Sequence, residues 1–268
     1  MKKLLIFVAI AFIGATFSCT SNTKRNANNN NDSIMFDSIK IDSTLSLSSD
    51  TGSHCHIKLC MTFATGKNAE KINEAIVNSG ILSSDFMPTV ALKNNIPGII
   101  DSFVTNYLKD YKDTYKELYD ANTYKEYNCE YDLKTHIEQN SDKYYTYVAS
   151  VYAYSGGAHG STLMINKNID AKSGKVVLLK DLFIPGYEKA LNDIIIKTLC
   201  EKYKVKNLTE LQEKTTIFSG IDAYAPENFI IKKNSIIFIY SSDEIACHAI
   251  GEICVEVKND VLKDLLKK

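Results

Sequence analysis

A short glycine-rich segment with one histidine, Tyr154-Ser155-Gly156-Gly157-Ala158-His159-Gly160, holds the residues best suited to chemistry. Gly156 and Gly157 permit a positive φ angle or a close approach of the backbone to a ligand. The His159 imidazole acts as a general acid or base only with a nucleophile or carboxylate in reach, and the sequence places none beside it. Structural, binding and catalytic loops therefore all remain open, and we assign no catalytic residue.

A second cluster, His54-Cys55-His56 with Cys60, has the residue types of a metal site. On a strand His54 and His56 share one face while Cys55 points to the other, which leaves an incomplete set of zinc ligands. The nucleotide-binding glycine loop, the Gly-x-Ser-x-Gly elbow and the His-Glu-x-x-His helix do not occur in the sequence. We therefore expect neither a metal nor a cofactor.

The cysteines allow disulfides if the chain is exported. Six follow Cys19, and an even number in an oxidising compartment permits up to 15 connectivities. Cys55 and Cys60 would lie on opposite faces of one strand, so we do not expect them to pair. Cys247 and Cys254 flank a candidate tight turn at Ile250-Gly251, and they form our candidate disulfide. The alternative is that several cysteines are small buried apolar residues.

The first nineteen residues predict export. Lys2 and Lys3 precede an uncharged run over residues 4–17, which is too short to span a bilayer easily and is typical of a signal peptide over residues 1–18. Thr16-Phe17-Ser18-Cys19 resembles the lipobox of bacterial lipoproteins, in the loose form found in Bacteroidetes. This resemblance implies an acyl anchor, such as palmitate, on Cys19.

Residues 19–50 have the composition of a lipidated flexible tether, rich in Asn, Ser, Thr and Asp and poor in apolar residues. Within this segment an Asp-Ser pair followed by Ile or Thr repeats every five residues, at Ser33, Ser38 and Ser43. Each copy resembles the acceptor motif of bacterial O-glycosylation, so these serines are candidate glycosylation sites. The alternative is a solvated linker with a degenerate repeat.

Composition predicts a globular body behind this segment. The chain has 268 residues, 45% hydrophobic and 24% charged, with a formal net charge of −1. No excess of positive charge supports nucleic-acid binding. Cleavage before Cys19 leaves about 250 residues, enough for one sizeable core or two smaller ones.

The period of the hydrophobic pattern predicts the elements that position these residues. Strands are expected over residues 54–63, 127–138, 144–154, 162–170, 228–231, 236–241 and 253–257, and helices over 68–78, 97–118, 187–199 and 261–266. Helices and strands are grouped in blocks, which favours the α+β class over alternating βαβ units. We expect an antiparallel meander sheet packed with helices, in two closely packed subdomains over residues 51–150 and 151–268.

A family resemblance rests on residues spread along this body. They are the Tyr154–His159 run, Asn166, Asp170, Gly174, Leu182-Phe183, Asn228-Phe229, Glu244-Ile245-Ala246 and Gly251. In their order and spacing, residues 55–262 resemble the paired extracytoplasmic domains of the RsiV anti-sigma factor. The first of those domains also occurs as the non-catalytic domain of the PdaC deacetylase. RsiV binds lysozyme through these domains, so the resemblance implies a non-catalytic recognition module.

Two departures shape this expectation. RsiV spans the membrane, whereas this chain would be held by Cys19 alone. The family often reads Glu-Ile-Ala-Pro-Tyr-Ala-x-Gly, and here Cys247-His248 replaces the Pro-Tyr pair that lies in the region implicated in lysozyme contact.

We therefore expect a lipid-anchored, non-catalytic binding protein of the bacterial cell envelope that faces the periplasm rather than the cell surface. Its partners would be the membrane, through the acyl anchor, and a lysozyme-like protein or an envelope glycan. The alternatives are a peptidoglycan-directed hydrolase and a structural or assembly lipoprotein. The candidate binding residues are Tyr154, Gly156, Gly157, His159, Asp243, Glu244 and His248.

Overall fold

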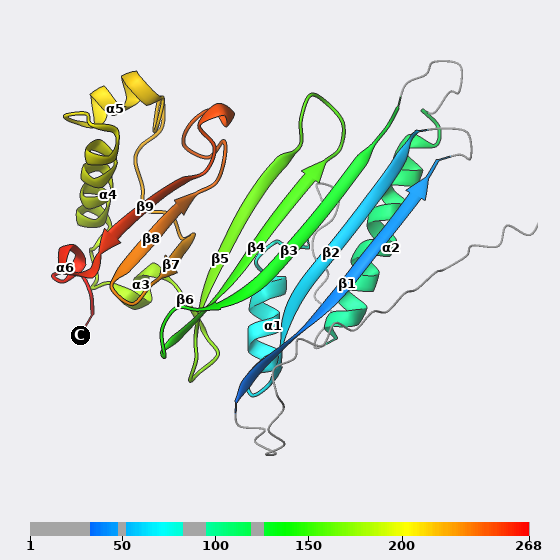
Figure 1. Ribbon diagram of the computed structural model, residues 1–268, viewed down its shortest axis with the longest axis horizontal. Coiled ribbons are helices and arrows are strands. Elements are labelled where there is room, and N and C mark those ends of the chain that lie inside the picture. Colours follow the sequence, from blue (N-terminus) through cyan, green and yellow to red (C-terminus); the bar gives the residue numbers. More distant parts are fainter. Residues whose placement is uncertain (1–32, 48–51, 83–94, 119–125, 268) are drawn as a thin grey trace, which may run out of the picture.

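The computed structural model describes residues 33–47, 52–82, 95–118 and 126–267, and the strands of these segments form two sheets (Figure 1). In this part of the chain the larger sheet has six strands in the order β1-β2-β3-β4-β5-β6, and the smaller has three in the order β7-β8-β9. Helices pack against both sheets, so the predicted α+β class is confirmed.

The larger sheet is a meander with one exception. It comprises β1 (Ile34–Ser46), β2 (His54–Gly66), β3 (Cys129–Gln139), β4 (Tyr144–Tyr154), β5 (Ser161–Asp170) and β6 (Val176–Val177). Neighbouring strands are antiparallel except β2 and β3, which run parallel. The prediction of an entirely antiparallel sheet is wrong at this pair. The β2–β3 connection contains α1 (Ala69–Val77) and α2 (Ile96–Tyr115), a crossover long enough to return the chain to the same end of the sheet.

Strand β1 corrects the prediction of a flexible tether. Residues 34–46 pair with β2 along their whole length, from Ile34 opposite Gly66 to Ser46 opposite His54. Ile39, Ile41 and Leu45 pack against the core while half-buried, and this burial offsets the entropy lost on ordering. The composition looked like a linker because an edge strand needs few apolar residues. Two of the three candidate glycosylation serines, Ser38 and Ser43, lie within β1; the signal peptide, Cys19 and residues 48–50 lie outside the described residues.

The first hydrophobic core lies between the larger sheet and the two helices α1 and α2, which Figure 1 shows behind the strands. Alternate residues of β2 enter this core, namely Cys55, Ile57, Leu59 and Met61. Helix α2 begins where the sequence predicts, because the Asn95 side chain accepts a hydrogen bond from the Gly98 N–H (3.2 Å) and Pro97 occupies the first turn. Its apolar stripe then faces the sheet.

The C-terminal part has its own core. It comprises α3 (Leu179–Leu182), α4 (Glu188–Tyr203), α5 (Leu208–Thr215), β7 (Phe229–Ile231), β8 (Ser235–Tyr240), the 3-10 turn η1 (His248–Ile250), β9 (Ile253–Lys258) and α6 (Asn259–Leu262). Leu191, Ile195 and Leu199 of α4 pack in the cluster that holds Phe238 and Val255 of the smaller sheet. Because the larger sheet continues to Val177 and this second core starts at Leu179, the division falls near residue 178 rather than at 150.

Asparagine side chains join the two sheets between β5 and β7. The Asn228 side-chain oxygen accepts a hydrogen bond from the Asn166 N–H (2.8 Å), and its amide donates to the Met164 carbonyl (2.8 Å). The backbone of a neighbouring strand would make the same two hydrogen bonds to the free edge of β5. A side-chain amide thus substitutes for the next strand of the sheet.

Asn168 repeats this arrangement two residues further along β5. Its amide donates to the Phe229 carbonyl (2.7 Å), and its oxygen accepts from the Ile231 N–H (3.0 Å) and the Thr146 hydroxyl (3.0 Å). Asn168 is 1% exposed, so these groups have little access to water. The two subdomains are therefore held together by buried polar bonds as well as by packing, and the loops at their ends are fixed relative to each other.

None of the helices in the described segments is both long and apolar enough to cross a bilayer.

Candidate functional site

Two loops that the sequence singled out meet in the structure. One joins β4 to β5, the other joins β8 to β9, and both lie at the upper end in Figure 1. The rings of His159 and His248 are stacked, with centroids 4.5 Å apart and planes inclined by 18°. Both histidines are exposed. We call residues 154–160 and 241–251, together with Tyr224, the paired-loop surface.

The β4–β5 loop is shaped by its glycines. Gly156 and Gly157 have φ angles of 100° and 96°, a region that residues with a Cβ rarely adopt. The Tyr154 hydroxyl donates a hydrogen bond to the Gly157 carbonyl (3.1 Å). A Cβ on Gly160 would lie 2.5 Å from the Tyr152 ring, so a larger residue there would displace that ring. These contacts set the path of the loop that presents His159.

The β8–β9 loop carries the two acidic residues predicted for the site. Asp243 Oδ2 lies 2.7 Å from His248 Nδ1 and orients the ring that stacks on His159. Asp243 itself has a φ of 67°, which shows that this turn is tightly constrained. Glu244 turns inward and accepts a hydrogen bond from the Ser241 N–H (2.7 Å). Asp243 is thus directed at the histidine pair and Glu244 at the base of the loop.

Tyr224 belongs to this surface, and sequence reasoning missed it. Its hydroxyl donates a hydrogen bond to Glu244 Oε1 (2.6 Å), and its ring packs edge-on against Tyr240 and Phe218. Burial, followed by the Glu244 carboxylate, raises the pKa of Tyr224, so the phenol remains a donor at neutral pH. Tyr224 stands in an irregular segment between α5 and β7, where no periodicity marked it.

The groups around His248 do not form a serine hydrolase relay. Ser242 Oγ lies 3.4 Å from His248 Nδ1, the same ring nitrogen that Asp243 contacts. A relay needs the serine on one imidazole nitrogen and the carboxylate on the other. Among the described residues, no three His, Cys, Asp or Glu side chains gather in a way that could hold a metal ion. The geometry is suited to contact with a partner through hydrogen bonds and ring faces.

Comparisons with known proteins match both halves of this chain. Residues 53–162 match the family described as "Deacetylase PdaC", and residues 180–260 match the family described as "Protein of unknown function (DUF3298)". The peptidoglycan-N-acetylmuramic acid deacetylase PdaC of Bacillus subtilis is 25% identical over 209 residues, which cover 76% of this chain and 41% of that protein. The chain is related to the PdaC and DUF3298 domains.

Solved structures of DUF3298 proteins share the fold. One from Bacteroides fragilis has a TM-score of 0.75 at 21% identity, covering 88% of this chain and 94% of that one. One from Pseudomonas aeruginosa has a TM-score of 0.59 at 13% identity, covering 88% and 96%. The resemblance to RsiV itself stays a prediction.

The paired-loop surface lies where the two matched regions meet. His159 belongs to the PdaC-like region and His248 to the DUF3298 region. Each region therefore supplies one of the two stacked rings, and the asparagine bonds between β5 and β7 hold the regions in this arrangement.

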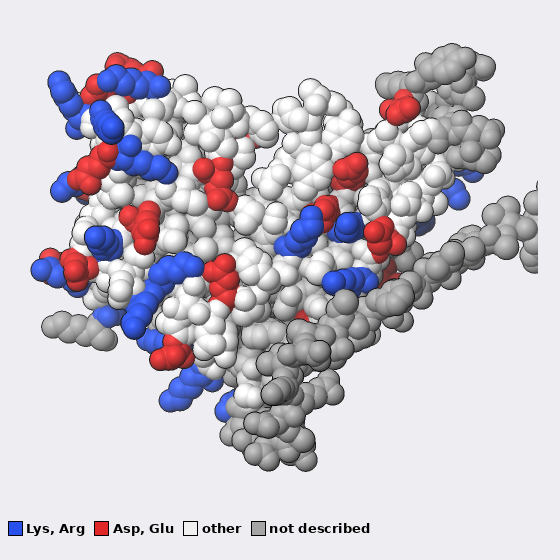
Figure 2. All heavy atoms as spheres, in the orientation of Figure 1, with Lys and Arg blue, Asp and Glu red and all other residues white. Residues whose placement is uncertain are grey.

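The neighbourhood of the paired-loop surface is apolar and carries little charge. Leu163, four residues after His159, is 45% exposed, Ile250 is 39% exposed and Tyr224 is 38% exposed. Neither loop contains a lysine or an arginine, and Figure 2 shows few charged side chains around their tips. Exposed apolar side chains that form one contiguous patch are typical of an interaction surface.

The other sequence candidates do not join this surface. His54 Nδ1 lies 2.6 Å from the Gly52 carbonyl and His56 Nε2 lies 2.8 Å from Asp42 Oδ1. His56 is opposite Glu130 in the sheet, two strands from Tyr154, and its ring is bound to the β1 carboxylate. Cys247 and Cys254 are free thiols in the structure, as are the other described cysteines, so the candidate disulfide between them stays a prediction. Cys247 contacts the Thr216 hydroxyl and Cys254 contacts Glu252. The 3-10 turn η1 lies between the two cysteines in the chain, where the sequence predicted a tight turn.

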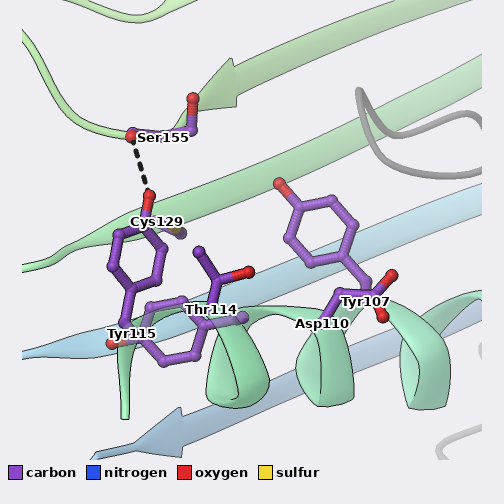
Figure 3. A pocket seen from close by; sticks show the side chains of 7 residues that line it. Tyr107, Asp110, Thr114, Tyr115, Cys129 and Ser155 are labelled. Atoms are coloured by element: carbon purple, nitrogen blue, oxygen red, sulfur yellow. Dashed lines mark hydrogen bonds between the residues drawn. The ribbon is translucent and has the colours of Figure 1, made fainter. Parts of the chain in front are cut away.

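A small pocket lies beside the β4–β5 loop, between α2 and the start of β3 (Figure 3). Its lining residues are Tyr107, Asp110, Tyr111, Thr114, Tyr115, Cys129 and Ser155. The Tyr115 hydroxyl donates to the Ser155 carbonyl (3.5 Å), which is the dashed line in Figure 3. The room inside is about 10 Å³, close to what one water occupies. The hydrogen bond between Tyr115 and Ser155 links the loop to α2, and the space beside it is too small for a ligand.

Proposed function

We propose that this chain is a non-catalytic recognition module of the bacterial cell envelope that binds a basic envelope protein through the paired-loop surface. The observation that carries this proposal is the stacked His159–His248 pair, held by Asp243 and accompanied on β5 and in the β8–β9 loop by the exposed apolar residues Leu163 and Ile250. Aromatic and histidine rings beside exposed apolar groups are frequent at protein interfaces.

The charge of the surface selects the class of partner. Asp243 and Glu244 are its only formally charged residues at neutral pH, so a basic protein is favoured and an acidic one is repelled. Lysozyme-type muramidases are basic proteins that act on peptidoglycan. The relative from Bacillus subtilis is named for peptidoglycan, which supports the envelope as the setting. A muramidase of the lysozyme type is therefore our candidate partner.

Capture of the purified chain by immobilised lysozyme tests this proposal. We expect binding in the micromolar range that weakens as salt is raised, because the two carboxylates of the surface contribute through screened charges. A basic protein without muramidase activity, such as cytochrome c, serves as the matched control. No binding to lysozyme at tens of micromolar would remove this candidate, and sedimentation with insoluble peptidoglycan would point to a glycan ligand instead.

The alternative is an enzyme acting on peptidoglycan, as the name of the PdaC relative suggests. Release of acetate or of muropeptides from purified peptidoglycan, lost in His159→Ala, would contradict the non-catalytic proposal.

The proposal includes a lipid anchor on Cys19, which places the module on the envelope facing the periplasm. Support comes from the uncharged run before Thr16-Phe17-Ser18-Cys19, which lies outside the described residues. We expect metabolic labelling with a palmitate analogue to mark the wild-type chain and not Cys19→Ala. Equal labelling of the two would refute the anchor while leaving the binding proposal intact.

A further inference from the structure

Two buried cysteines face each other across the parallel strand pair. Cys55 of β2 and Cys129 of β3 are direct partners in the register, so their side chains leave the sheet on the same face. Neighbouring strands are about 4.8 Å apart, which falls within the range of roughly 4.4–6.8 Å between the Cα atoms of a disulfide. The backbone thus places both thiols where a disulfide is geometrically possible.

This pair is buried beneath α2. Cys55 is 0% exposed and Cys129 is 5% exposed. Burial, with a smaller contribution from Cys129, raises the pKa of Cys55 to about 12. Such a thiol is a poor nucleophile once it is folded. Any bond between these two cysteines would therefore form while the strands assemble, before α2 covers them.

The remaining cysteines of the described segments lie elsewhere. Cys60 points to the opposite face of β2, between Lys40 and Lys134 of the neighbouring strands. Cys200, Cys247 and Cys254 belong to the C-terminal part. Within the described residues, Cys55 and Cys129 are thus the two cysteines that the strand register sets side by side.

We propose that Cys55 and Cys129 become joined by a disulfide when this chain folds in an oxidising compartment. The oxidant is a disulfide of another molecule, such as a thiol–disulfide oxidoreductase. The thiolate of one cysteine attacks that disulfide and displaces a thiolate, and the second cysteine then displaces the other. Two S–H bonds and one external S–S bond are lost, and one internal S–S bond and two external thiols are formed. The free thiols of the structure are the reduced form.

The bond would close a loop that contains α1 and α2 and would fix the start of β3. Glu130, the residue after Cys129, pairs with Tyr154 at the base of the β4–β5 loop. The crosslink would therefore stabilise the strand that supports the paired-loop surface.

Peptide mapping of the full chain, secreted to the periplasm of a bacterial host, tests this proposal. After alkylation and non-reducing digestion with trypsin, residues 41–58 and 126–134 should appear as one linked species, two hydrogens lighter than their sum. Reduction should split it, and Cys55→Ser or Cys129→Ser should abolish it. Cys60→Ser is the matched control and should leave it unchanged. Recovery of both peptides as separate alkylated species would overturn the proposal.

A stability measurement checks the same bond without depending on the variants. Wild-type chain refolded without reductant should melt roughly 10 °C above chain refolded with it, because a loop of this length removes much entropy from the unfolded state. The double variant Cys55→Ser/Cys129→Ser should show no such difference. Equal melting temperatures of wild type under both conditions would contradict the crosslink.

Discussion

Replacing Asn168 with alanine is expected to lower the free energy of unfolding by about 4 kcal/mol, because three buried groups lose their partner. These groups are the Phe229 carbonyl, the Ile231 N–H and the Thr146 hydroxyl, which the Asn168 side chain contacts at 2.7, 3.0 and 3.0 Å. With Asn168 at 1% exposure, water cannot easily replace the lost amide. Denaturation in urea, followed by circular dichroism, measures the change.

Asn192→Ala is the control for this prediction. Its side chain makes a single, longer hydrogen bond to the Ala223 carbonyl (3.2 Å) and is only partly buried, so we expect a loss of about 1 kcal/mol or less. If Asn168→Ala cost no more than Asn192→Ala, the asparagine bonds would not be what holds the two sheets together.

Removal of both stacked rings is expected to weaken capture by lysozyme at least about tenfold, as loss of an interface centre does. The double variant His159→Ala/His248→Ala loses the 4.5 Å ring contact and the group that Asp243 orients. Because both residues are exposed on loops, the melting temperature should change little. Titration of immobilised lysozyme with each variant gives the ratio of dissociation constants.

His136→Ala is the matched control, since His136 is an exposed histidine on β3 that lies 3.3 Å from a carboxylate of Glu138. It should bind like the wild type. Wild-type affinity in the double variant would move the binding site away from the paired-loop surface without refuting lysozyme binding itself. The two single variants should each lose part of the effect, because the rings act as a pair.

The sequence was a good guide to individual elements. The alternation over residues 127–138 and the spacing of Ile99, Phe103 and Tyr107 predicted β3 and α2, because the burial of one face leaves a local periodic trace. It failed at β1, whose polar residues resembled a linker, and at Tyr224, which lies in an irregular segment. At both places the residue is ordered by tertiary contacts, and the local sequence pattern carries no sign of them.

The sequence alone determined the α+β class, most of the helices and strands, and the two loops around His159 and His248. The tertiary structure was needed to show that these loops meet, that Cys55 lies opposite Cys129, and that asparagines join the sheets. The physical reason is that periodicity records which face of an element is buried, whereas the choice of neighbour depends on long-range register and on crossovers such as α1 and α2.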